Sequence, residues 1–375
     1  VNIGLDNYEA TGARSQGPIP GNAIDFESRF RVFDSLSRVG LRGTEDLGNG
    51  LRAVFQIESG VNVDAGGTLG QNGLTNASSG TFASRDSFAG LDSAWGRITF
   101  GRQSIYWVNG ELAQYFANYV NQEVPWTNGT MLGRISRNGA AVARQANTVQ
   151  YTTPTFAGFN ATFSYSPNDQ ESVQNNTTQD TDGQIWGATL RGRYGAFHGQ
   201  FDYVLKEGNT NLTTGRQFEY DGYKLGIGWK YMPGANVSFI WVRNETNDAL
   251  GVAPGQNVSQ NGYTINWEHT LGNIQLLAQY GWLDSLKGCA GTEGTAAGAA
   301  GTVSCADTKA QAWLVGARYL LSKRTWLYLT WNEIDNESNQ FSDWTGGNVT
   351  SVGATTLVPY GADPRLIALG VFHAF

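Results

Sequence analysis

The strongest constraint on the fold is an alternation of side-chain character that repeats along the chain. In the stretch 37–59, apolar residues at odd positions alternate with large polar residues at even positions, namely Arg38, Arg42, Arg52, Gln56 and Glu58. Side chains of a β-strand point alternately to opposite faces of a sheet, so the pattern predicts strands with one apolar and one charged face. The same alternation returns in other segments, including 159–165, 186–194, 197–206, 223–231, 263–268 and 313–319. The chain is therefore predicted to be all-β, with one face too polar for a packed core.

The segments that connect the predicted strands alternate between short and long. The short ones are tight turns at 44–50, 92–96, 154–158, 195–199, 232–236, 271–273 and 322–325. Between them lie longer polar segments at about 13–27, 64–80, 106–143, 168–183, 207–218, 247–260, 283–307 and 334–362. Tight turns at one end and long loops at the other are typical of transmembrane barrels, in which lipid-facing and lumen-facing residues alternate. The count gives about sixteen strands, and side chains cannot fill so wide a barrel, so an aqueous channel is expected.

Composition narrows the classes of protein further. No long apolar run occurs, which excludes transmembrane helices. The sequence from Val1 does not have the basic segment followed by an apolar one that a signal peptide has, so any signal peptide is expected to have been removed or never to have existed. The net charge is −7 and no basic stripe is present, which argues against a nucleic-acid partner. Only 40% of the 375 residues are hydrophobic, and this small supply of apolar material favours a wall with two different faces over a packed core.

The two cysteines flank a tract rich in Gly, Ala and Thr. A metal site needs more ligands than Cys289, Cys305 and three scattered histidines provide, so no metal site is expected. A disulfide at the base of a surface loop is the preferred interpretation, and it would contribute about 3 kcal/mol in the chain-entropy model. Such a bond indicates an oxidising compartment. Two unpaired thiols are the alternative.

Three stretches resemble consecutive strands of a known family, the general porins of Gram-negative bacteria, and especially the trimeric porins of β-proteobacteria. SRVGLRGTEDLGNGLRAVFQIESG at 37–60 resembles the second and third strands of that family. SRDSFAGLDSAWGRITFGRQ at 84–103 resembles the fourth and fifth, and NTVQYTTPTFAGFNATFSY at 147–165 resembles the sixth and seventh. The last strand alternates up to Phe375 and resembles the C-terminal assembly signal of the family.

The resemblance implies a single 16-stranded antiparallel transmembrane β-barrel over residues 1–375, with short periplasmic turns and long extracellular loops. It implies a homotrimer in the outer membrane of a Gram-negative bacterium. Such a channel passes small hydrophilic solutes and ions passively and needs no cofactor. Positions 106–143 correspond to the third loop of the family, which folds into the lumen and forms its constriction.

The same resemblance places charged residues around the constriction. Two acids lie on the loop, Glu111 and Glu123, and the arginines that match wall positions are Arg38, Arg85 and Arg134. Further charges of the lumen are expected at Arg42, Arg102 and Arg144. Arginine stays charged and presents a planar set of donors, so three wall arginines opposite two acids predict a modest preference for anions.

These assignments have plainer alternatives. An inward arginine can simply solvate the lumen or pair with a neighbouring glutamate, and the loop acids can hydrogen-bond to backbone. The alternation that points Arg85 inward also predicts that Asp86 points outward, which a membrane barrel tolerates only near its edge or at a subunit contact. The segment 168–183 is acidic and rich in Asn and Gln, so it either binds lipopolysaccharide through divalent cations or is a solvated loop.

The outward residues change from even to odd numbers within one predicted strand, which predicts that this strand is irregular. Phe30 and Val32 are even-numbered, whereas Val39 and Leu41 are odd-numbered. Both pairs can face outward only if a β-bulge lies between them, near residues 35–37.

Three other classes of protein compete with the porin interpretation. An enzyme needs a nucleophile beside a base, and His198, His269 and His373 have no matching serine and acid on inward positions, so no enzyme is expected. A soluble sandwich would bury the outward aromatic residues in a dry interior. A substrate-specific channel would combine arginines with aromatic residues of the third loop, namely Trp107, Tyr115, Tyr119 and Trp126.

Overall fold

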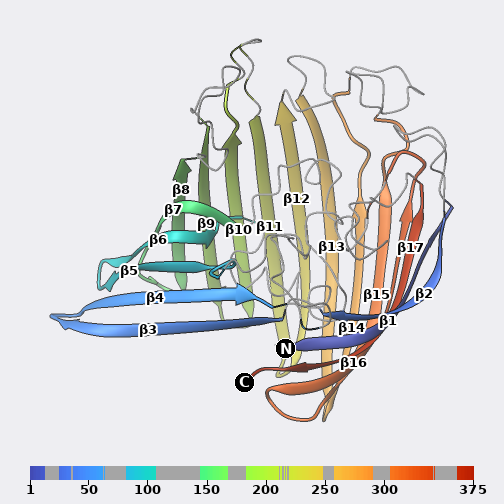
Figure 1. Ribbon diagram of the computed structural model, residues 1–375, viewed down its shortest axis with the longest axis horizontal. Helices are drawn as coiled ribbons and strands as arrows, with labels where there is room; N and C mark the ends of the chain where they lie inside the picture. The colour runs from blue at the N-terminus through green and yellow to red at the C-terminus, as the bar shows by residue number, and fades with distance from the viewer. Residues whose placement is uncertain are drawn as a thin grey trace.

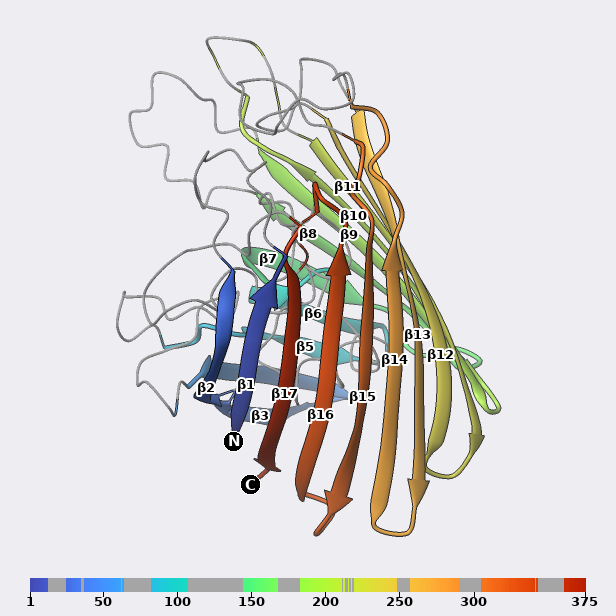
Figure 2. The same ribbon diagram turned by 90° about the vertical axis from the view of Figure 1, so that its right-hand side faces the viewer.

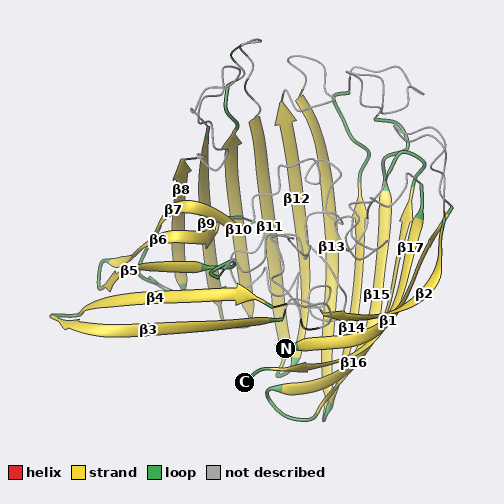
Figure 3. Ribbon diagram, in the orientation of Figure 1, coloured by secondary structure: helices red, strands yellow, loops and turns green. Residues whose placement is uncertain are grey.

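The computed structural model describes the sheet and its shorter connections. The described residues are 1–12, 25–34, 37–61, 63, 82–106, 144–167, 183–210, 212, 215, 217, 219–247, 257–289, 305–340, 342 and 361–375. No helix in these ranges is long and apolar enough to cross a membrane. Figure 3 shows strands joined by turns and loops throughout the described chain.

Seventeen strands form one antiparallel sheet. The first nine are β1 (Asn2–Thr11), β2 (Phe26–Asp34), β3 (Arg38–Gly48), β4 (Leu51–Gly60), β5 (Ser87–Ser93), β6 (Gly96–Ser104), β7 (Arg144–Thr152), β8 (Phe159–Pro167) and β9 (Gln184–Tyr194). The remaining eight are β10 (Phe197–Glu207), β11 (Glu219–Met232), β12 (Ala235–Asn247), β13 (Asn257–Leu271), β14 (Ile274–Leu283), β15 (Ala310–Leu320), β16 (Thr325–Asn336) and β17 (Asp363–His373).

The ladders follow chain order and join the two ends of the chain. Each strand from β3 to β17 pairs with the next, and β1 pairs with both β17 and β2. Among the described residues no ladder joins β2 to β3, so the sheet runs from β2 through β1 and β17 round to β3. Figures 1 and 2 show this strongly curved wall, with β1 beside β17 and the two termini near one another.

The strand count differs from the sequence prediction at one place. About sixteen strands were expected and seventeen are described, and the extra division lies at residues 35–37, between β2 and β3. On β2 the odd-numbered Arg31 pairs with the buried Asp6, so Phe30 and Val32 face the other way and are exposed. On β3 the even-numbered Arg38 pairs with Glu58, which leaves the odd-numbered Val39 and Leu41 on the opposite face. The phase of the outward side chains therefore changes between the two strands, as the numbering of these residues predicted.

The two faces of the sheet have the polarity expected of a membrane wall. Across β11 to β15 one register row of outward residues is apolar or aromatic, namely Ile227, Phe239, Ile265, Tyr280 and Trp313. The neighbouring inward row carries Ser238, Asn266 and Gln279, which are buried. In these two rows the apolar residues are on the outside and the polar residues on the inside, which overturns the alternative of a soluble sandwich with buried aromatics.

Part of the inner wall is apolar, which the alternation did not predict. On β14 to β17, β1 and β2 a cluster of inward residues is buried, and its larger members include Tyr8, Phe33, Leu277, Leu314, Tyr328, Ile334 and Leu366. Small residues fill the places between them, including Ala312 and Ala368. The inner face is mixed on β9 to β13 as well, because buried apolar residues such as Ile185, Val204 and Ile240 lie there among the polar ones.

Aromatic residues with polar tips mark both ends of the outward face. At the short-turn end, Trp267 Nε1 donates to the hydroxyl of Tyr231 at 2.9 Å, and this hydroxyl lies 2.8 Å from His269 Nδ1. In the halves of the strands nearer the long loops, the Tyr203 hydroxyl donates to Asp221 at 2.7 Å and the Tyr263 hydroxyl to Asp284 at 3.2 Å. Rings with one polar atom suit the two boundaries between hydrocarbon and water.

A charge introduced in the middle of the outward face is expected to destabilise the protein in lipid. Ile265→Arg places a guanidinium half-way along β13, and its free energy of unfolding in a phospholipid bilayer should fall by about 2–4 kcal/mol. Asn257→Arg is the matched control, because Asn257 is exposed on the same strand and face at the long-loop end, where the loss should be about 0–1 kcal/mol. Equal losses for the two variants would contradict the assignment of the outward face to hydrocarbon.

Candidate functional site

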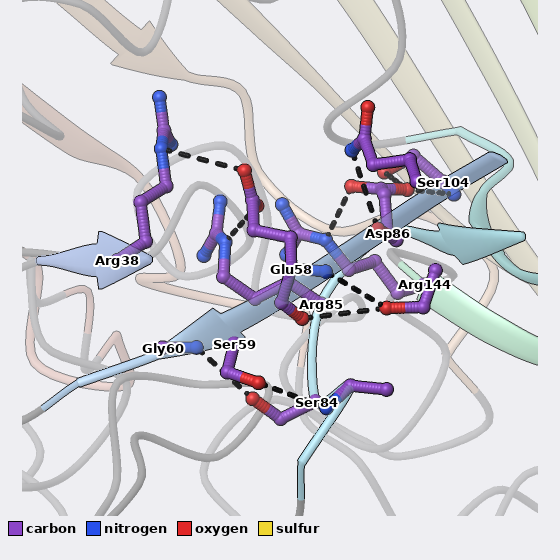
Figure 4. A network of polar contacts seen from close by, with 12 residues as sticks. Arg38, Glu58, Ser59, Gly60, Ser84, Arg85, Asp86, Ser104 and Arg144 are labelled. Atoms are coloured by element: carbon purple, nitrogen blue, oxygen red, sulfur yellow. Dashed lines mark hydrogen bonds and ion pairs between the residues drawn. The ribbon is translucent and has the colours of Figure 1, made fainter. Parts of the chain in front are cut away.

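A cluster of charged side chains lies where five segments of the chain meet. Glu58 comes from the end of β4 and Arg38 from the start of β3, and the segment 82–86 runs beside them before β5 begins. The end of β6 contributes Ser104 and the start of β7 contributes Arg144 (Figure 4). We call this set the Glu58 cluster: Arg38, Glu58, Arg85, Asp86, Arg102, Ser104 and Arg144.

Glu58 is shared by two arginines. Arg38 Nε lies 3.7 Å from one carboxylate oxygen of Glu58, and Arg85 Nε donates to the other. The Arg85 backbone N–H also donates to the Glu58 carbonyl at 3.0 Å, so the two residues are bonded through both main chain and side chain. The Arg38 side chain is 52% exposed and the Arg85 side chain only 12%. Arg38 is therefore the member of the pair that solvent ions can reach.

Asp86 is the second acid of the cluster, and its carboxylate has three donors. Arg144 Nε donates to Asp86 Oδ2 at 2.8 Å, and the backbone N–H and hydroxyl of Ser104 donate to Oδ1 at 2.6 and 2.7 Å. The prediction that Asp86 points away from the charged face is wrong. Asp86 precedes β5, where the alternation of a strand does not yet apply, and its partners hold it against the ends of β6 and β7.

Serine hydroxyls fix the segment that carries Arg85 and Asp86. The Gly60 N–H donates to Ser84 Oγ at 3.1 Å, and the Ala83 N–H donates to Ser59 Oγ at 2.8 Å. Arg102 Nε donates to the Ser84 carbonyl at 3.0 Å. These bonds hold the segment 83–86 to β4 and β6, and they determine where the two charges of residues 85 and 86 lie.

The cluster keeps an excess of positive charge at neutral pH. Four guanidinium groups, on Arg38, Arg85, Arg102 and Arg144, face the carboxylates of Glu58 and Asp86. Burial lowers the pKa of Arg85 to about 10, with Arg144 acting in the same direction and Glu58 opposing it, so Arg85 stays protonated. Burial acts to raise the pKa of Asp86, but Arg144 and the Ser104 donors outweigh it, and this pKa lies below its ordinary value.

The structure brings together some of the predicted site residues and leaves others outside the described ranges. Arg38, Arg85, Arg102 and Arg144 all belong to the Glu58 cluster, and Arg42 lies opposite Gln56 further along β3 and β4. Arg134, Glu111 and Glu123 fall outside the described residues, as do the aromatic residues of 107–143 and nearly all of 168–183. Glu58 was named only as an inward residue, and Asp86 was assigned to the wrong face.

The cysteines are joined, as the sequence predicted. The disulfide between Cys289 and Cys305 has a Cα separation of 5.6 Å. Its base is tied to β13 and to the chain beyond β16 through Thr308, because Gln260 and Gln340 both donate to the Thr308 carbonyl, at 3.1 and 2.8 Å. In the described part of the chain no group of His, Cys, Asp and Glu residues has the arrangement of a metal site.

The comparisons with known proteins agree with this architecture. A family model described as Gram-negative porin matches residues 7–339. The major outer membrane protein P.IB of Neisseria gonorrhoeae is 26% identical over 343 residues, which cover 87% of this chain and 84% of that protein. An outer membrane porin protein of Bordetella pertussis is 36% identical over 152 residues, which cover 38% of this chain and 35% of that protein.

Solved structures of porins share the fold. The anion-selective porin from Comamonas acidovorans superimposes with a TM-score of 0.71 at 23% identity, over 100% of this chain and 99% of that chain. Salmonella typhi OmpF in complex with daunomycin gives a TM-score of 0.60 at 15% identity, over 99% of this chain and 96% of that chain. At these identities the likeness concerns the fold alone.

Replacing Asp86 should destabilise the protein in a pH-dependent way. Asp86→Asn removes the charge that Arg144 and Ser104 bind, and the free energy of unfolding should fall by about 2 kcal/mol at neutral pH. The folded-state pKa is depressed, so this contribution is present above the ordinary Asp pKa of about 4 and disappears as the pH falls through the lower folded value. Denaturant unfolding at neutral and strongly acidic pH, followed by tryptophan fluorescence, should show the variant and wild type converging in acid.

Glu45→Gln is the control for this measurement, because Glu45 is exposed on β3 and its loss should change stability little at any pH. A difference between Asp86→Asn and wild type that persists unchanged in strong acid would show that the carboxylate charge is not what stabilises the cluster.

Proposed function

Because this chain belongs to the Gram-negative porin family, we propose that it forms a water-filled channel for the passive diffusion of small hydrophilic solutes and ions. It is an outer-membrane protein of a Gram-negative bacterium, and its relatives are channels rather than enzymes. The inverted polarity of the sheet carries the proposal: exposed apolar side chains point outward, while buried polar side chains such as Asn266 and Gln279 point inward. A sheet of this kind separates hydrocarbon from an aqueous interior.

The proposed channel is a closed barrel of 16 strands in which β2 and β3 act as two halves of one bent strand. Ser37 supports this, because both ends of the ladder meet there. The Asn2 N–H at the start of β1 donates to Ser37 Oγ at 2.9 Å, and the Val61 N–H beyond β4 donates to the Ser37 carbonyl at 2.8 Å. Closure would leave no sheet edge exposed to lipid, where unpaired backbone groups are costly.

The segment 106–143 is proposed to fold into the lumen and narrow it. The entry of this segment supports the proposal, because Ile105 and Tyr106 are buried rather than directed into solvent above the sheet. Arg134, Glu111 and Glu123 would then complete the constriction with the Glu58 cluster. A specific channel that uses Trp107, Tyr115, Tyr119 and Trp126 would have the same entry, and it is distinguished by saturable block of the ion current by one solute.

The channel is proposed to prefer anions modestly. The support is the excess of guanidinium groups in the Glu58 cluster, since rings of arginine attract anions and repel cations. A structural neighbour is named an anion-selective porin, which fits the same sign. The partially exposed Arg38 is expected to contribute most, because its charge is screened by one shared carboxylate only.

Assembly and surface contacts extend the proposal. The chain is proposed to form homotrimers, and a solved structural neighbour from Vibrio cholerae is described in a trimer form. The acidic segment 168–183 is proposed to contact lipopolysaccharide through divalent cations. Phe375 is exposed at the C-terminus, which fits the proposed role of the terminal aromatic as an assembly signal.

Reconstitution into a planar lipid bilayer tests the channel itself. The purified protein should produce discrete, long-lived current steps that grow with salt concentration. Steps in groups of three would support the homotrimer. A folded protein that inserts into the bilayer without conducting would overturn the proposed function.

Selectivity should follow the charges of the Glu58 cluster. Arg38→Ser combined with Arg85→Ser removes two positive charges, so the reversal potential in a potassium chloride gradient should shift towards cation preference and the conductance should rise. Glu58→Gln removes the negative charge that these arginines share and should shift the reversal potential the opposite way. Both shifts should shrink at high salt because of screening. Shifts of the same sign for the two variants would show that the cluster does not set selectivity.

A further inference from the structure

The residues that follow β6 cross the inside of the curved sheet. β6 ends at Ser104, and the next two residues, Ile105 and Tyr106, are 1% and 0% exposed. Their contacts lie on β9 and β11, which are three and five strands further along the ladder. The chain therefore bridges two parts of the wall that are not neighbours in the sheet.

Two inward glycines make room for this bridge. A Cβ added at Gly187 on β9 would lie 2.4 Å from Ile105 Cγ2, and a Cβ added at Gly222 on β11 would lie 2.9 Å from the tip of the Tyr106 ring. Contacts this short do not occur between real side chains, so any larger residue at these positions would push the bridge away. Glycine weakens a strand interior, and its presence there indicates a close approach by another part of the chain.

A buried ion pair fixes the bridge on the same side. Lys224 Nζ donates to the Tyr106 carbonyl at 2.8 Å, lies 3.2 Å from Asp202 Oδ2 and sits 5.0 Å from the centre of the Tyr106 ring. The Asp202 carboxylate is completely buried and also accepts from Thr189 Oγ1 at 2.7 Å and Gln200 Nε2 at 2.6 Å.

Burying this charge pair is unfavourable unless its remaining hydrogen-bonding capacity is used. The Tyr106 carbonyl supplies one of the acceptors that Lys224 needs. The ion pair and the bridge therefore stabilise one another.

We propose that Lys224 and Asp202 are positioning residues that hold Ile105 and Tyr106 against β9 and β11, and so fix the width of the lumen at this level. The inference rests on the proposed channel function, because the width of the lumen is measured through the ion current that the channel carries. It extends that function to residues outside the Glu58 cluster. Lys224 and Asp202 carry opposite charges, so together they act on pore width rather than on the sign of the selectivity.

A disulfide across the first contact tests the position of the bridge. The Cβ built at Gly187 lies 3.8 Å from Ile105 Cβ, within the range of about 3.5–4.5 Å that disulfides span. The double variant Ile105→Cys, Gly187→Cys should oxidise fully, and peptide mapping should find this bond beside the native Cys289–Cys305 bond. Free thiols at 105 and 187 in the folded, oxidised protein would overturn the proposal whether or not the protein conducts.

The same variant tests the effect on the channel. In its oxidised form the conductance and the open-channel noise should match wild type. After reduction, the conductance should shift upward and the noise should increase. Wild type treated with the same reductant controls for loss of the native disulfide and should change little.

Removing the anchor tests the role of the ion pair. In the double variant Asp202→Asn, Lys224→Met the net charge is unchanged, and the conductance and noise should rise while the reversal potential stays near that of wild type. Gly222→Ala should act in the same direction because it displaces the Tyr106 ring. Gly199→Ala controls for adding a methyl group within a strand, because Gly199 pairs with the outward Ile227 and an added Cβ there meets nothing nearer than 3.5 Å.

The outcomes separate this proposal from the proposed function. If wild type does not conduct, the channel function fails, and the cross-link still decides whether the bridge exists. If wild type conducts but the anchor variants keep its conductance and noise, the positioning role is overturned and the channel function stands. If the double variant does not fold, Gly222→Ala and the cysteine pair still decide the proposal.

Discussion

The structure depends on one requirement of the membrane environment: each backbone N–H and C=O must find a partner within the protein, because hydrocarbon offers none. An antiparallel sheet meets this requirement only when each strand is paired on both sides. Here β1 has two partners, β2 and β17, which brings the first and last strands of the chain together. The alternating sequence follows from the same requirement, since each strand of such a wall separates two different surroundings.

The inner face follows a second rule, which concerns charge. Three buried or half-buried acids among the described residues of this face each have a cation beside them. Asp6 is bonded by Arg31 at 2.6–2.8 Å, Asp202 by Lys224 and Asp86 by Arg144. Each of these pairs is locally neutral, so it adds little to the field across the lumen. Glu58 differs from these acids because Arg38 and Arg85 share it, and the remaining positive charge sits partly in solvent. The proposed selectivity therefore depends on this imbalance more than on the total number of lumen arginines.

The sequence predicted the parts of the fold that depend on local pattern. Alternation placed Ile227 and Ile265 outside and Asn266 inside, and the even and odd phases of Phe30 and Val39 located the change between β2 and β3. The alternation did not predict contacts between segments that are far apart in the sequence. Asp86 is bonded by Arg144, which is 58 residues away, and Lys224 meets Tyr106 across 118 residues. The apolar inner cluster around Leu314 and Leu366 was missed because alternation identifies two faces but not which residues cover each of them.

Glycines have two roles in this chain, one in local turns and one in contacts between distant segments. The chain has 49 glycines, and some have the ordinary role in tight turns, such as Gly50 with φ of +77°. Others lie inside strands, where glycine weakens the sheet and a local pattern gives no reason for it. Gly187 and Gly222 receive Ile105 and Tyr106, and Gly228 lies against the imidazole of His198. An inward glycine in such a strand therefore indicates where another side chain enters the wall, so the glycines shape the lumen together with the arginines.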